Sequence, residues 1–135
     1  MLYNVDIQLK NSTRTTLKMV PSNVDGVFGG NESPCVVILN GDKLRQHIEL
    51  KKNDLSHYLR NIDRFMDLDD TAESLNLMPD LDMPVYSFTG NGEFNDLEIQ
   101  QGGHRTYLLL GRYGVDKMPV IVRYSLADKF KYIFG

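Results

Sequence analysis

The feature that most constrains the fold is a glycine pair, Gly102 and Gly103, between two regular segments. Residues 93–101 before the pair alternate between polar and apolar, which predicts a half-buried strand. Residues 104–113 after it are apolar on more than one side, which predicts a helix packed on several faces. The continuous apolar run at 118–122 predicts a strand in a sheet interior. A strand, turn, helix and strand in this order favour a fold that mixes helices with a sheet.

The glycine turn has the local chemistry of an anion site. Glycines allow backbone conformations closed to other residues, and the first turn of a helix presents unpaired N–H groups at a positive dipole end. His104 and Arg105 add donors, and an arginine can bind a phosphate through two parallel hydrogen bonds. The alternative is a plain strand-to-helix turn with Arg105 in solvent, and the spacing fits both interpretations.

Two carboxylates precede the turn. Asp96 and Glu98 fall on the polar side of the predicted strand with Gln100, and that side leads into Gly102. If this side lines the site, Glu98 is the first candidate for a metal ligand or general base because it is nearer the glycines, and Asp96 is the second. His104 is a further catalytic candidate. The same side could also simply face solvent.

The first half of the chain predicts β-structure. Alternation at residues 2–9 and a β-prone run at 15–20 indicate a hairpin, and 36–39 indicates a short buried strand. The dipeptide Asn40–Gly41 is a strong hairpin signal, so residues 43–50 are expected to return as a half-exposed strand. A short helix over 43–50 is the rival interpretation.

The second half predicts further helices and strands. They are a helix over 55–66, a short helix over 71–77, a strand over 83–88, a turn at 90–92, a helix C-cap at Gly114 and a final helix within 126–134. An acidic run at 63–73 lacks the spacing and the glycine of an EF-hand, which favours a solvated face over a cation site.

Composition narrows the class of protein. With 135 residues and 41% hydrophobic content, the chain is predicted to be a single α+β domain over 1–135, with a mixed sheet, a β-hairpin-rich portion at 1–50 and a core at 51–135. No apolar run approaches a membrane span, and the start lacks a secretory signal, so a cytoplasmic location without membrane contact is expected. The single Cys35 excludes an intrachain disulfide. The net charge of −3 does not favour DNA as a partner.

Residues 98–124 also resemble the core motif of the ParB/sulfiredoxin-like superfamily. The matching features are the turn Gly102-Gly103-His104-Arg105, the apolar helix after it, Gly114, and the strand Met118-Pro119-Val120-Ile121-Val122. In that superfamily a strand, a G-x-x-R or G-x-H-R turn, a helix and an "IPVIV" strand form a nucleotide-binding unit. A weaker resemblance reaches back to residue 65 and leaves 1–50 unplaced.

The resemblance implies a ParB/sulfiredoxin-like fold that binds a nucleoside triphosphate, ATP or CTP, with Mg²⁺. By this resemblance the phosphates would be held by Gly102, Gly103, His104, Arg105 and Thr106, and the metal by Glu98 and Asp96. Relatives use the site for CTP-dependent clamping on DNA, ATP-dependent repair of oxidised cysteine, phosphorylation of serine, and nuclease or ATPase activity. Such diversity means that the fold alone does not decide the function.

Two departures from the family pattern exclude some of the functions known among the relatives. Sulfiredoxin places a catalytic cysteine between the second glycine and the histidine, whereas Gly103 and His104 are adjacent here and Cys35 is far away in sequence. Partition-type ParB proteins carry an arginine pair in the turn and a helix-turn-helix domain after it, whereas this sequence has His104-Arg105 in the turn and such a domain is not expected. Sulfinic acid reduction and chromosome segregation are therefore not expected.

Three functions remain as expectations. The first is a nucleotide-binding protein with Mg²⁺-dependent hydrolysis or phosphoryl transfer, and the second is a nuclease or DNA-processing protein. The third is a non-catalytic module that binds or inhibits a protein partner. A phage or mobile-element origin would suit such a compact chain.

Overall fold

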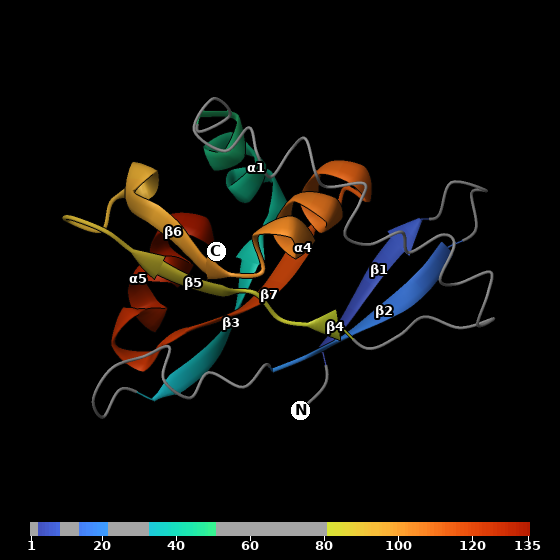
Figure 1. Cartoon of the computed structure of the whole chain (residues 1–135), viewed down its shortest axis with the longest axis horizontal. Coiled ribbons are helices and arrows are strands. Elements are labelled where there is room, and N and C mark those ends of the chain that lie inside the picture. The colour runs from blue at the N-terminus through green and yellow to red at the C-terminus, as the bar shows by residue number, and fades with distance from the viewer. Residues whose placement is uncertain (1–2, 9–13, 22–32, 51–80) are drawn as a thin grey trace.

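The structure, a computed structural model, describes residues 3–8, 14–21, 33–50 and 81–135. These residues form an α+β fold with two mixed sheets and three helices (Figure 1). The predicted α+β class is confirmed. The helices predicted over 55–66 and 71–77 and the acidic run within 63–73 lie outside the described residues.

The smaller sheet contains the predicted N-terminal hairpin. Strands β1 (Tyr3–Gln8) and β2 (Arg14–Val20) pair antiparallel, and the short strand β4 (Leu81–Asp82) adds to β2 in parallel. One side of the hairpin is buried and the other is exposed, as expected for an antiparallel pair with one solvated face. Its buried side chains are Val5, Ile7, Leu17 and Met19. The hairpin prediction is confirmed.

The larger sheet has the strand order β3-β7-β5-β6. Strand β7 (Lys117–Arg123) lies between β3 (Pro34–Asn40), to which it is antiparallel, and β5 (Val85–Phe88), to which it is parallel. Strand β6 (Leu97–Gln101) completes the sheet as the antiparallel partner of β5. Residues 118–122 of β7 are all buried, which confirms the interior strand predicted there.

Helix α4 (Gly103–Tyr107) begins two residues after β6 and continues as a π-helix over Leu108–Arg112. The four residues 107–110 are buried to 1% exposure or less, so this segment is packed on several sides as predicted. Gly114 then adopts a positive φ of 58°, as expected for the residue after a helix end. In Figure 1 this helix lies beside α1 (Gly41–Leu50), and the smaller sheet lies to one side of both.

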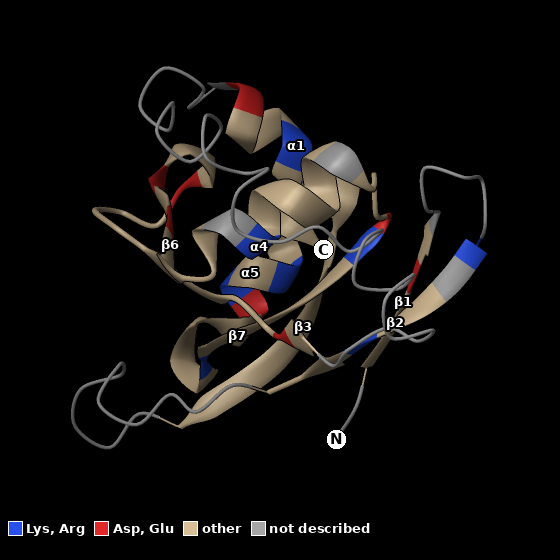
Figure 2. Ribbon diagram, turned by 45° about the vertical axis from the view of Figure 1, so that its right-hand side comes forward, with Lys and Arg blue, Asp and Glu red and all other residues tan. Residues whose placement is uncertain are grey.

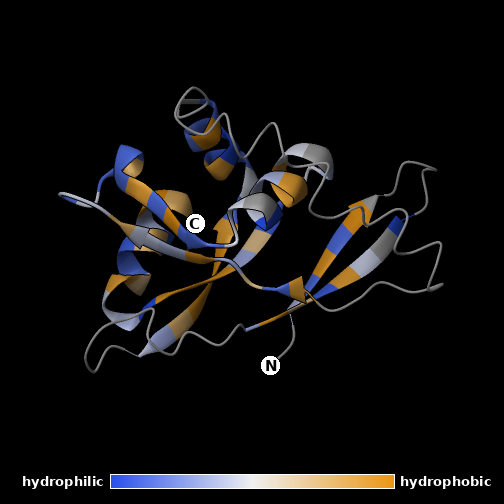
Figure 3. Ribbon diagram, in the orientation of Figure 1, coloured by the Kyte–Doolittle hydropathy of each residue, from blue (hydrophilic) through white to orange (hydrophobic). Residues whose placement is uncertain are grey.

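The C-terminal helix α5 (Ala127–Phe134) packs against β3 and closes an aromatic cluster. Its Phe130 ring stacks on Phe88 at 4.2 Å between centroids, and its Phe134 ring stacks on Phe94 at 5.0 Å. The final helix predicted within 126–134 is confirmed. Its buried residues are Ala127, Phe130 and Phe134, and hydrophobic and hydrophilic residues alternate along its ribbon (Figure 3).

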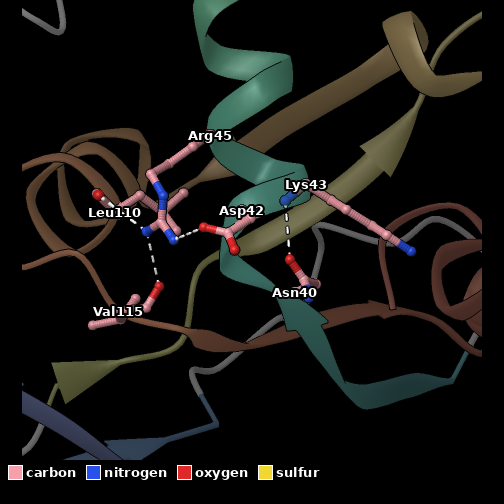
Figure 4. Close-up of polar contacts among 6 residues, drawn as sticks. All are labelled: Asn40, Asp42, Lys43, Arg45, Leu110 and Val115. Carbon is pink, nitrogen blue, oxygen red and sulfur yellow. Dashed lines mark hydrogen bonds and ion pairs between the residues drawn. The ribbon is translucent and has the colours of Figure 1, made fainter.

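The strand predicted over 43–50 is wrong, because these residues belong to helix α1. The Asn40 side-chain oxygen accepts a hydrogen bond from the Lys43 N–H at 3.0 Å and so caps the helix (Figure 4). The Gly41 N–H donates to the Asp116 carbonyl at 2.7 Å. Asparagine and glycine thus start a helix here, and the rival interpretation of this segment is the correct one.

Candidate phosphate-binding site

The candidate site is the turn that joins β6 to α4, and its geometry depends on Gly102. This residue has a φ of +82°, in the left-handed region that favours glycine. A Cβ added to Gly102 would lie 2.8 Å from the Pro84 Cβ and 2.8 Å from the Arg105 Nη2. The Gly102 carbonyl accepts the Thr106 N–H at 2.9 Å, which fixes the first turn of the helix. Only glycine fits this position.

Arg105 folds back over the turn, since its guanidinium lies directly against Gly102. Its Nη1 lies 3.9 Å from the Asp82 Oδ2, too far for a hydrogen bond, and its side chain is 25% exposed. Its Nε is buried and has no hydrogen-bond partner among the described residues. The cation is therefore held in place by packing and has donors that are not fully used.

A second buried polar atom lies just before the turn in the sequence. Val85 pairs with Gln101 and Tyr86 with Ile99, so Gln100 is an extra residue in the ladder, as in a β-bulge. The Gln100 Oε1 is buried without a hydrogen-bond partner in the described part of the chain. Buried polar groups are normally satisfied. The turn is thus flanked in sequence by two polar side chains with unused hydrogen-bonding capacity.

Thr106, which the resemblance placed among the phosphate-binding residues, is buried in the structure. Its side chain is 1% exposed, and its hydroxyl is hydrogen-bonded to the Tyr86 phenol at 2.9 Å. Its N–H is already bonded to the Gly102 carbonyl. Burial raises the pKa of Tyr86 above its usual range, so the phenol is neutral. Thr106 therefore anchors the helix to the sheet, and its N–H and its hydroxyl each already have a hydrogen-bond partner.

The predicted shared face of Asp96 and Glu98 is wrong. Residues Phe94–Asp96 form a 3₁₀ turn, so β6 begins only at Leu97. The Asp96 carboxylate accepts the Glu93 N–H at 2.9 Å and caps this turn, whereas Glu98 is exposed on the strand opposite Ser87. Among the described residues no group of three or more His, Cys, Asp or Glu side chains is arranged to hold a metal ion.

The other two predicted residues of the turn are Gly103 and His104. Gly103 and the backbone of His104 form the start of α4, as expected. The His104 side chain lies outside the described part of the structure, so its roles in catalysis and phosphate binding stay predictions. Asp82 was not predicted, because it meets Arg105 where the segment before β5 packs against the Gly102 turn, a contact that no local sequence signal marks.

Comparisons with models of protein families, with curated proteins and with solved structures find no match. The resemblance to the ParB/sulfiredoxin-like superfamily therefore rests on the sequence motif of residues 98–124. Basic and acidic residues are interspersed along the described ribbon (Figure 2). No helix in the described part of the chain has the length and apolarity of a membrane span.

Proposed function

We propose that this protein binds the phosphate groups of a nucleotide at the turn between β6 and α4. The observation that carries the proposal is the state of Arg105, whose guanidinium is packed against Gly102. Its Nε is buried and has no hydrogen-bond partner within the described ranges, and its carboxylate neighbour Asp82 is 3.9 Å away. A phosphate oxygen is the acceptor that such a guanidinium binds best. The match of this turn to the family motif supports a nucleotide as the source of the phosphate.

The backbone adds donors to the same place. The first N–H groups of a helix have no partner within the helix, and the helical segment that starts at Gly103 continues through Arg112. The ligand would therefore meet the amides of Gly103 and His104 on one side and the Arg105 guanidinium on the other. The Asp82 carboxylate competes with phosphate for Arg105, and it must move away when phosphate binds.

The proposal stops at binding and includes no chemical step. Hydrolysis or phosphoryl transfer with Mg²⁺ would need carboxylates placed beside the phosphates. Of the two predicted ones, Asp96 caps a 3₁₀ turn and Glu98 is exposed on β6. The described residues thus support phosphate binding, and the proposal is limited to it.

A thermal-shift panel of nucleoside triphosphates, with and without Mg²⁺, tests the proposal. A ligand at about 100 times its dissociation constant adds roughly 2.7 kcal/mol of stability, which raises the melting temperature by on the order of 10 °C. We expect the shift to be lost in Arg105→Ala and kept in Arg14→Ala, which removes an exposed arginine from β2. No shift with any nucleotide, or an equal shift in Arg105→Ala, would overturn the proposal.

A further inference from the structure

The edges of the two sheets are protected unequally. Among the described strands the edges are β1, β4, β3 and β6. Three of them carry an exposed carboxylate: Asp6 on β1, Asp82 on β4 and Glu98 on β6. Strand β3, with the sequence PCVVILN, has no charged residue along its length.

The difference matters because an edge strand presents a row of unpaired N–H and C=O groups. Proteins prevent unwanted pairing at such edges with charged side chains, bulges or very short strands. Strand β6 has both a charge and the irregularity at Gln100, and β4 is only two residues long. Strand β3 is seven residues long, and its Ile38 side chain is 40% exposed. Its one protecting residue is the proline at its first position, Pro34, so among the described strands β3 has the edge that is most open to pairing.

We propose that β3 pairs antiparallel with β3 of a second copy of the chain, about a two-fold axis, so that two four-stranded sheets join into one. Such a pairing sets a strand against its own reversed copy, so a charged strand would bring like charges together, at a cost. An uncharged strand avoids this cost, and β3 is the edge that meets the condition. With Val37 at the centre, Val36 would lie opposite Ile38 of the partner subunit, and apolar side chains would meet across the axis.

The proposed interface is independent of the phosphate site. Strand β6, which leads into the Gly102 turn, is at the opposite edge of the sheet from β3. Pairing through β3 therefore leaves the turn accessible in both copies. The two proposals can fail separately.

The mass of the protein in solution, measured by sedimentation from micromolar to near-millimolar concentration, tests the pairing. We expect the wild type to shift from monomer to dimer as concentration rises. Ile38→Lys should stay monomeric, because it would place two ammonium groups near the axis. The matched control is Tyr132→Lys, which adds the same charge at an 88% exposed apolar residue of α5 and should dimerise like the wild type. A wild type that stays monomeric, or an Ile38→Lys variant that still dimerises, would overturn the proposal.

Hydrogen exchange on the wild type gives a second test that needs no variant. Outward-facing amides of β3 should exchange slowly at high concentration and faster on dilution, while those of β7 should not change. Protection of β3 that is independent of concentration would mean that the chain covers this edge itself. Fast exchange at every concentration would mean that another molecule is needed. Either result would refute pairing between two copies.

Discussion

The chain passes from a strand into a helix through a glycine at two places, and the two junctions are built differently. At the first, from β3 into α1, a Cβ on Gly41 would lie 2.1 Å from the Val115 carbonyl oxygen. The Gly41 N–H is bonded to the Asp116 carbonyl, and the Asn40 side chain caps the helix. This junction uses its glycine to let another part of the same chain approach, and the N–H groups of Gly41 and Lys43 both have partners.

At the second junction, from β6 into α4, Gly102 is needed for its positive φ and for the close approach of Pro84 and Arg105. The Arg105 Nε remains without a hydrogen-bond partner in the described part of the chain. The comparison teaches that a glycine at a helix start indicates that other atoms pack closely against its backbone. It does not indicate which part of the protein those atoms belong to. The first junction is filled by backbone, and the second is filled by the side chains of Pro84 and Arg105.

Two arginines show the same contrast. The Arg45 Nη1 donates to the Leu110 carbonyl at 3.3 Å and to the Val115 carbonyl at 2.9 Å, and its Nη2 pairs with Asp42 (Figure 4). These bonds join α1 to the π-helix and to the loop before β7. Among the described residues Arg105 has one charged neighbour, the Asp82 carboxylate, 3.9 Å away. The first arginine is therefore a structural link, whereas the second makes no comparable set of hydrogen bonds within the described residues.

The largest effect is expected from Gly41→Ala. The new methyl group would meet a backbone carbonyl, which moves only if the loop before β7 moves, so we expect a loss of about 3 kcal/mol in the free energy of unfolding. Urea denaturation measures it. Gly111→Ala is the matched control, because a Cβ there meets nothing within 4 Å, and it should be neutral or slightly stabilising. Equal stability of the two variants would show that the first junction is not closely packed.

A smaller effect should separate the two arginines. Arg45→Met leaves two carbonyls with one partner fewer and should cost about 2 kcal/mol of unfolding free energy. Arg105→Met removes a loose, partly exposed ion pair and should cost less than about 0.5 kcal/mol. Both are measured by urea denaturation without ligand. A larger loss for Arg105 would mean that this side chain supports the fold and would weaken the case for a binding role.

The sequence predicted the elements whose signals are local. The hairpin of β1 and β2, the interior strand β7 and the helix α5 follow from alternation, continuous apolarity and helical spacing. The start of α1 was misjudged because Asn40–Gly41 is equally suited to a hairpin turn and to a helix cap. What decides between them is the contact of Gly41 with the Val115–Asp116 loop, which is distant in sequence.

The candidate site was also predictable only in part, because some of its contacts join residues that are distant in sequence. The turn at Gly102 and the position of Arg105 in the first helical turn could be inferred from glycine chemistry and spacing. The hydrogen bond of the Thr106 hydroxyl depends on Tyr86, and the approach of Asp82 to Arg105 depends on how the segment before β5 packs against the Gly102 turn. The alternation of polar and apolar residues placed Asp96 on a strand. That pattern does not detect that the Asp96 side chain caps a turn by accepting the Glu93 N–H.

At neutral pH an effect smaller than that of Arg45→Met is expected at the anchor of the second junction, the hydrogen bond between Tyr86 and Thr106. Tyr86→Phe should cost about 1 kcal/mol of unfolding free energy at neutral pH. Burial raises the pKa of Tyr86 in the folded protein above its unfolded value of 10.0, so its contribution is constant below that pH and declines as the pH rises above it. The stability of the wild type should therefore fall toward that of Tyr86→Phe above about pH 10. Urea denaturation of both proteins between about pH 8 and about pH 11 measures the difference. Curves that stay parallel throughout would show that the phenol ionises equally in both states and that α4 is not anchored by a buried hydroxyl pair.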